Sequence, residues 1–151
     1  MKISQNFIFV PSMKKAHIVL LNDGEARQMF KTPNLVKAAK NILSLGPYAA
    51  IIKKGEHGAL LFTSDNHFNA PGYPLEEIKD PTGCGDSFGG ALIGCLAKMK
   101  SHDQAAIRKA MIYASVIASF NAEDFSLERL KTLTQKEVEG RYQEFVKMRN
   151  F

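Results

Sequence analysis

A glycine-rich run in the middle of the chain, Asp80 to Gly90, most strongly limits how this sequence can fold. The run has no apolar periodicity and leads directly into the apolar segment 91–97, so it predicts a loop that opens a helix. A helix entered through glycines presents backbone N–H groups beside the positive end of its dipole, which suits a phosphate or a developing oxyanion. The glycines let the backbone come close to such an anion.

Asp86 stands, in this interpretation, one residue before the first turn of the helix. A carboxylate is an unexpected neighbour for an anion site unless it takes a proton from a hydroxyl that then attacks a bound phosphoryl group. The pairing therefore indicates phosphoryl transfer. On the loop alone, an equally good interpretation is that Asp86 is the N-cap of the helix and the glycines form a tight turn.

The same run resembles the second signature of the ribokinase-like (PfkB) carbohydrate kinase family, whose core is Gly-Ala-Gly-Asp. The resemblance implies that Gly83, Cys84 and Gly85 form an anion hole and that Asp86 is the catalytic base. Cys84 replaces the alanine of the family pattern. This is a small change, because the anion hole uses backbone N–H groups.

Two residues beside this hole, Asp80 and Thr82, lie where many family members bind a monovalent cation such as K⁺. The resemblance therefore implies a cation site there. The simpler role of both residues is to hold the loop, and we favour that role.

An upstream tetrapeptide, Asn22-Asp23-Gly24-Glu25, is similar to the Asn-x-x-Glu element of the same family. The resemblance implies that Asn22 and Glu25 help to organise Mg²⁺ and the phosphates of ATP, largely through water. Mg²⁺ takes oxygen ligands and keeps several of its waters, so the residue types suit this role. Taken alone, the tetrapeptide is an ordinary strand-to-helix turn.

The stretch from Lys53 to Gly58 resembles the nucleotide loop of the family, commonly Thr-x-Gly-x-x-Gly. Gly55 and Gly58 are in register with the pattern, and the resemblance implies that this loop binds ATP. Lys53 stands in place of the threonine, which removes a hydroxyl and offers an amine that could meet phosphate or be solvated. A glycine turn between two strands is common in unrelated proteins.

The other patterns follow an α/β order, and the chain shows no linker or internal repeat, so we predict a single domain over residues 1–151. The resemblance implies the three-layer α/β/α ribokinase-like (Rossmann-like) sheet. Periodicity and turn residues predict a buried parallel strand at 16–21, helices at 26–30 and from the cap at 32–34 to 45–47, strands at 48–52, 59–63 and 67–70, a buried helix over 103–119, and one or two surface helices within 127–148.

Composition narrows the choice of partners. The net charge is +5, but the basic residues are interleaved with acidic ones along the 151 residues, so ATP suits the chain better than nucleic acid. No apolar run reaches the length of a membrane span, and residues 1–11 lack the pattern of a signal peptide, which predicts a cytoplasmic protein. We expect Cys84 and Cys95 to be too far apart for a disulfide and therefore reduced, with Cys95 in the core.

The resemblance runs from about residue 6 to residue 130, yet it matches only the carboxyl-terminal half of a PfkB kinase. The amino-terminal half of the family supplies the lid and most sugar contacts. Half a sheet exposes an edge strand, so we expect a homo-oligomer or a complementing chain.

Two hypotheses about function follow. The first is an ATP-dependent carbohydrate kinase that transfers the γ-phosphoryl group to a sugar hydroxyl. The second is a nucleotide-binding or subunit-interaction module without kinase activity, and a structural fragment without a ligand is a third.

Overall fold

The computed structural model describes residues 11–150, and the chain divides into two compact units. The amino-terminal unit comprises Met1–Gly55 with Ala59–Asn69, and the carboxyl-terminal unit comprises Glu56–Gly58 with Ala70–Phe151. Each unit is described below by itself, and a single domain over residues 1–151 stays a prediction. Residues 1–10, which carry most of the segment without a signal-peptide pattern, lie outside the described residues.

The amino-terminal unit is built on a mixed sheet with the strand order β1-β2-β3-β4. β1 and β2 are parallel, with Asn22 opposite Lys53, whereas β2 and β3 are antiparallel. Parallel neighbours need a crossover connection, and two helices, α2 and α3, supply it. The bounds are β1 (Ile18–Asn22), α2 (Asp23–Phe30), α3 (Leu35–Ser44), β2 (Ala49–Lys53), the 3₁₀ turn η1 (Gly55–His57), β3 (Ala59–Phe62) and β4 (His67–Ala70).

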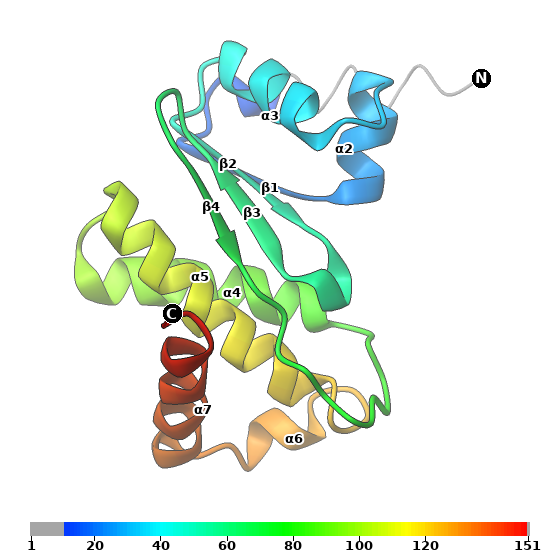
Figure 1. The fold of residues 1–151 in the computed structure, drawn as a ribbon, viewed down its shortest axis with the longest axis vertical. Coiled ribbons are helices and arrows are strands. Elements are labelled where there is room, and N and C mark those ends of the chain that lie inside the picture. Colours follow the sequence, from blue (N-terminus) through cyan, green and yellow to red (C-terminus); the bar gives the residue numbers. More distant parts are fainter. Residues whose placement is uncertain (1–10, 151) are drawn as a thin grey trace. The chain divides into compact units, whose positions relative to one another are not determined.

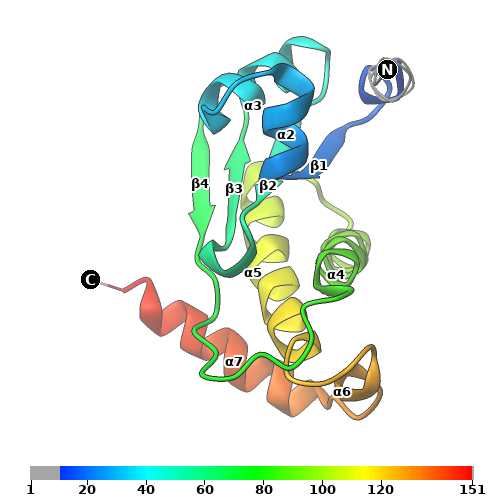
Figure 2. The same ribbon diagram turned by 90° about the vertical axis from the view of Figure 1, so that its right-hand side faces the viewer.

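Helices α2 and α3 cover one face of this sheet, as Figures 1 and 2 both show. α3 presents Ala38, Ala39 and Ile42 on a single side, which is the spacing of an amphipathic helix. Small residues on the helix let it lie close to the strands. The buried cluster between helices and sheet comprises Met13, Val19, Leu21, Ala26, Ala38, Ala39, Ile42, Ala50 and Ile52.

The predicted strand at 16–21 is confirmed but begins two residues later, at Ile18. The reason is local, because the N–H of Ala16 donates to the carbonyl of Met13 and so belongs to the preceding turn. The predicted cap at 32–34 is also confirmed. The side chain of Asn34 accepts a hydrogen bond from the N–H of Lys37 at 3.0 Å and starts α3.

The carboxyl-terminal unit is helical and is organised around α5. α4 packs along α5, and α6 and α7 pack against α5 as well (Figure 1). The predicted buried helix is confirmed, since the fully buried side chains of this unit include Ile107, Met111 and Val116. The bounds are α4 (Cys84–Met99), α5 (Gln104–Asn121), α6 (Glu128–Lys131) and α7 (Gln135–Met148).

Both cysteines are free thiols, as expected, but the placement of Cys95 in the core is wrong. Phe88 and Leu92 are the buried residues of α4, and Cys95 is only half-buried. The partial burial raises the pKa of the Cys95 thiol, while Lys109 and Lys98 act against this shift. Within residues 11–150, no helix combines the length and the apolarity that crossing a bilayer requires.

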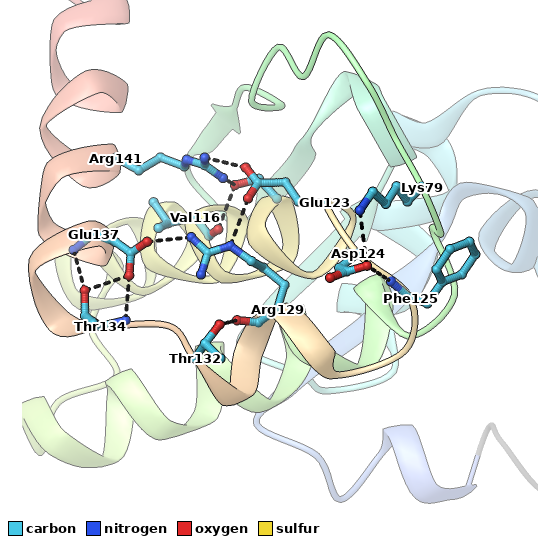
Figure 3. Close-up of polar contacts among 11 residues, drawn as sticks. Lys79, Val116, Glu123, Asp124, Phe125, Arg129, Thr132, Thr134, Glu137 and Arg141 are labelled. Atoms are coloured by element: carbon cyan, nitrogen blue, oxygen red, sulfur yellow. Dashed lines mark hydrogen bonds and ion pairs between the residues drawn. The ribbon is translucent and has the colours of Figure 1, made fainter.

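A partly buried charge network joins the carboxyl-terminal end of α5 to α6 and α7 (Figure 3). Glu123 accepts from Arg129 at 3.1 Å and, through its other oxygen, from Arg141 at 2.5 Å. Arg129 also donates to Glu137 at 2.6 Å. Arg129 thus links Glu123, just after α5, to Glu137 of α7, and Arg141 of α7 binds the same Glu123. The network therefore fixes the end of α5 relative to α7.

Arg141 has a second set of contacts with aromatic rings. Its guanidinium lies 3.5 Å from the ring centroid of Phe120 and 4.3 Å from that of Tyr73. It also donates to the hydroxyl of Ser119 at 3.0 Å. The side chain of Arg141 is only 13% exposed. Its positive charge is therefore stabilised mainly by these partners and less by water.

Glu137 makes the stability of this unit dependent on pH. Hydrogen bonds from the hydroxyl and the N–H of Thr134, followed by one from Arg129, lower the pKa of Glu137 from 4.5 to about 2. Because the folded-state pKa lies below the unfolded one, this stabilisation is complete at neutral pH and is lost as the pH falls through 4.5 toward 2. Glu137→Gln should therefore reduce the loss of unfolding free energy between about pH 6 and pH 3, measured by urea denaturation. Glu128→Gln, in a well-exposed pair, should leave that pH dependence as it is in the wild type.

Candidate active site

The glycine-rich loop enters α4 one turn earlier than the sequence suggested. Gly83 is the N-cap with φ 82° and ψ −7°, and the helix begins at Cys84. This left-handed conformation is readily available to glycine, which explains why a glycine stands there. The N–H of Ser87 donates to the carbonyl of Gly83 at 2.8 Å and closes the first turn.

Asp86 consequently lies inside the first turn, as its third residue, and not before it. The interpretation of Asp86 as the N-cap is also wrong, since Gly83 holds that position and no side chain caps α4. Asp86 is exposed. A carboxylate in the first turn interacts favourably with the helix dipole, and an exposed one is accessible to a substrate hydroxyl.

The backbone around Gly83, Cys84 and Gly85 lies at the amino-terminal end of a 16-residue helix. Such an end concentrates N–H groups and partial positive charge, which is the chemistry of an anion hole. The N–H of Cys84 donates to the carbonyl of Pro81 at 3.2 Å. An anion that binds the N–H of Cys84 has to share or replace that bond.

Asp80 organises the loop on the other side of Thr82. One carboxylate oxygen accepts from the N–H of Thr82 at 2.9 Å, and the other accepts from the N–H of Ser126 at 3.3 Å. Hydrogen bonds from Thr82 and then from Ser126 hold the pKa of Asp80 below its usual value. These contacts supply the simpler role considered for Asp80, which is to hold the loop. Among residues 11–150, no group of three or more His, Cys, Asp or Glu side chains is arranged to hold a metal ion.

Asn121 contacts the same loop and was not singled out from the sequence. It is fully buried at the last position of α5, and its side chain reaches Thr82 and Cys84. Its only sequence signal is an amide that follows the mainly apolar stretch 114–120. The sequence predicted a helix that ends at residue 119, whereas α5 extends two residues further and includes Asn121.

In the amino-terminal unit, Asn22 and Glu25 form a reciprocal capping box at the start of α2. The side chain of Asn22 accepts from the N–H of Glu25 at 2.7 Å, and the side chain of Glu25 accepts from the N–H of Asn22 at 2.9 Å. The Asn-x-x-Glu spacing is therefore explained locally by helix capping, and it starts α2 three residues earlier than predicted. Both side chains are exposed.

The sheet brings Lys53 next to this pair. Lys53 ends β2 and is the register partner of Asn22, the last residue of β1. Because both strands run in the same direction, the two residues meet at the carboxyl-terminal edge, where ligands of α/β sheets commonly bind. Gly55 follows at φ 58°, with open space where a side chain would project.

Gly58 has a packing reason of its own. A Cβ atom there would lie 2.0 Å from the carbonyl oxygen of Ala70, and φ is 83°. Gly72 is equally constrained, because its Cβ would lie 2.0 Å from the carbonyl oxygen of Glu56. The backbone of residues 56–58 thus touches that of 70–72 in the carboxyl-terminal unit. Backbone packing alone requires a glycine at position 58.

The chain is similar in sequence to known proteins. A family model described as "pfkB family carbohydrate kinase" matches residues 11–130. Fructokinase-2 from Oryza sativa subsp. japonica is 33% identical over 107 residues, which cover 68% of this chain and 31% of that protein. The chain therefore spans about a third of the length of this curated relative.

Solved structures match over nearly the whole chain. Aminoimidazole riboside kinase from Salmonella enterica, complexed with aminoimidazole riboside and an ATP analogue, has a TM-score of 0.83 at 23% identity, over 94% of this chain and 47% of that one. A protein described as a ribokinase II from E. coli, in complex with ATP and Mg²⁺, has a TM-score of 0.75 at 26% identity, over 90% of this chain and 42% of that one. The predicted fold class, the ribokinase-like α/β/α sheet, is confirmed by these matches.

Proposed function

Because the chain belongs to the pfkB family of carbohydrate kinases, we propose that it transfers the γ-phosphoryl group of ATP to a sugar hydroxyl. The observation that carries the proposal is the entry to α4. There, Gly83 turns the backbone into a long helix whose first turn contains Cys84, Gly85 and an exposed Asp86. An anion hole and a carboxylate base are the two devices that this transfer needs from the protein.

In the proposed reaction, the carboxylate of Asp86 takes the proton of the sugar hydroxyl, and the sugar oxygen forms a bond with the γ-phosphorus. The bond between that phosphorus and the β–γ bridging oxygen breaks, and ADP leaves with the electron pair. Negative charge on the equatorial phosphoryl oxygens is stabilised by the backbone N–H groups at Gly83, Cys84 and Gly85 and by the helix dipole.

In the amino-terminal unit, the proposal assigns nucleotide binding to Lys53 and Gly55, with Gly58 completing the loop pattern. Asn22 and Glu25 suit Mg²⁺ because the capping box holds their oxygen-bearing side chains in fixed, exposed positions, where they can contact metal-bound waters. Mg²⁺, when bound, neutralises charge on the phosphates of ATP.

The carboxyl-terminal unit carries the remaining cation proposal. Asp80 and Thr82 are the residues that a K⁺ ion beside the loop would use. Binding of K⁺ there would add to the hydrogen bonds by which Asp80 already orders Thr82.

A second candidate function is a nucleotide-binding or subunit-interaction module without kinase activity. In the sheet formed by residues 11–150, β1 lies at an edge, and its residues Ile18 and Leu20 are half-buried. An apolar parallel strand at an edge favours association, so we propose a homo-oligomer or a complementing chain. We also propose that the protein acts in the cytoplasm.

Sugar-dependent release of ADP separates the two functions. We expect the chain with Mg-ATP to release ADP faster when fructose, ribose or aminoimidazole riboside is added, because the matched kinases act on such molecules. The mass in solution, measured on the same sample, reports association. A folded chain that binds Mg-ATP but shows no acceleration with any acceptor would contradict the kinase and favour the module.

A further inference from the structure

The side chain of Asn121 is fully buried, yet every hydrogen bond that the structure gives it leads to the glycine-rich loop or the first turn of α4. Its amide nitrogen donates to the carbonyl of Thr82 at 3.1 Å and lies 3.5 Å from the sulfur of Cys84. Its amide oxygen accepts from the hydroxyl of Ser87 at 3.3 Å. A buried amide so completely used is costly to replace.

These three partners surround Gly83. Thr82 precedes it, Cys84 follows it, and Ser87 donates its own N–H to the carbonyl of Gly83. A Cβ added to Gly83 would have the amide nitrogen of Asn121 as its neighbour, at 3.7 Å. Asn121 therefore lies directly against the one loop residue whose positive φ turns the chain into the helix.

The hydrogen bond to Thr82 also sets the direction of a backbone donor. A carbonyl oxygen only accepts, so the amide nitrogen of Asn121 has to face it. In a trans peptide unit the C=O and the following N–H point in opposite directions. The carbonyl of Thr82 points at α5, and the N–H of Gly83, in the same peptide plane, consequently points away from α5.

The helix end that carries Asn121 is itself held in place. Glu123, two residues later, accepts from Arg129 and Arg141 (Figure 3). The guanidinium of Arg141 lies over the ring of Phe120, 3.5 Å from its centroid. The carbonyl of Ala122 accepts from the N–H of Lys79 at 3.0 Å. The end of α5 is thus a fixed support from which one amide reaches the loop.

We propose that Asn121 is a positioning residue for the anion hole, which holds the peptide between Thr82 and Gly83 so that the N–H of Gly83 is directed to a phosphoryl group. This inference rests on the proposed function for the identity of the anion. The geometry of the loop, however, can be tested without any nucleotide.

Cys84 provides the test, because its sulfur lies beside Asn121 and Cys95 on the same helix serves as an internal standard. The full-length chain is treated with iodoacetamide, and alkylation of each cysteine is followed by peptide mass spectrometry. In Asn121→Ala we expect Cys84 to react about tenfold faster, with the rate at Cys95 within twofold of wild type. Ser119→Ala, which removes a buried hydroxyl of the same helix whose bonds go to Val116 and Arg141, should leave the rate at Cys84 as it is in wild type.

Asn121→Val fills more of the space of the amide than alanine does and has no hydrogen-bond donor for Thr82, so it provides a second variant if the alanine variant folds poorly. We expect the same selective acceleration at Cys84. Unchanged reactivity of Cys84 in both variants would overturn the proposal. Equal acceleration at both cysteines would also overturn it, because Asn121 would then support only overall stability.

Nucleotide added to the same assay separates this inference from the proposed function. If Mg-ATP slows alkylation of Cys84 in wild type, and protects it at least tenfold less well in Asn121→Ala, the positioning of an anion hole is supported. If Mg-ATP gives wild type no protection while Asn121→Ala still accelerates Cys84, the loop geometry stands and the proposed nucleotide site fails. Protection that is equal in wild type and Asn121→Ala would overturn the positioning role.

Discussion

Asp86→Asn should lower sugar-dependent ADP release by a factor of about 100 or more, because general-base catalysis by a positioned carboxylate commonly contributes that much. The amide keeps the shape of the side chain but cannot take the proton of the hydroxyl. Asp86 is exposed and caps nothing in the structure, so its replacement should not disturb folding. The measurement is the ADP-release rate at saturating Mg-ATP, with the thermal unfolding midpoint determined in parallel.

Asp103→Asn is the matched control for this variant. It makes the same replacement of Asp by Asn at the start of the neighbouring helix, α5. There the side chain of Asp103 caps the helix by accepting from the N–H of Ala106 at 2.8 Å. Asn caps helices about as well as Asp, so activity and stability should both stay near wild type. Turnover of Asp86→Asn within threefold of wild type would contradict the role of Asp86 as the base.

Arg141→Met should lower the free energy of unfolding of the carboxyl-terminal unit by about 2–3 kcal/mol, somewhat less than for a fully buried ion pair. The variant keeps an unbranched apolar side chain but removes the charge that pairs with Glu123 and the stacking on Phe120 and Tyr73. Glu123 keeps Arg129 as a partner, which limits the loss. Urea denaturation followed by circular dichroism measures the effect.

Two further variants locate the cause of that effect. Arg141→Lys keeps the charge but loses the planar group that stacks on the rings, so it should recover only part of the stability. Lys131→Met removes a cation from an exposed pair with Glu128 and should cost less than about 0.5 kcal/mol. An Arg141→Met chain as stable as Lys131→Met would show that the network in Figure 3 contributes little.

Much of the fold could be predicted from the sequence because its elements carry local signals. The apolar run that became β1, the cap at Asn34 and the long apolar helix α5 each follow from periodicity and capping chemistry. Their ends were less predictable. α4 begins at Cys84 because Gly83 adopts a left-handed conformation, which the letters alone do not reveal.

The residues of the candidate site also differ in how well they could be predicted from the sequence. Gly83 to Asp86 were identified from a contiguous motif, and the structure places them together in one helical turn. Asn121 was missed because its partner Thr82 is 39 residues away in the sequence and only the packing of α5 brings them together. Asn22 and Glu25 have the spacing of a capping box, but the family resemblance led us to interpret them as ligands of Mg²⁺ and ATP.

Gly58 has two possible explanations. Its position in a nucleotide-loop pattern suggested a contact with ATP, whereas in the structure the close approach of the Ala70 backbone is enough to explain why a glycine stands there. A glycine can satisfy a motif and a packing constraint at once. Only a ligand-binding measurement separates the two roles.

Isothermal titration of the purified chain with Mg-ATP tests the central claim most directly, because a kinase and a nucleotide-binding module both require a nucleotide site. We expect binding with a dissociation constant of about a micromolar, equal within a few-fold in wild type and Asp86→Asn, since the base acts on the acceptor hydroxyl. The titrated sample should be shown to be folded by circular dichroism. Absence of binding heat over a range of temperatures in a folded wild-type chain would contradict the claim that this chain holds a working nucleotide site.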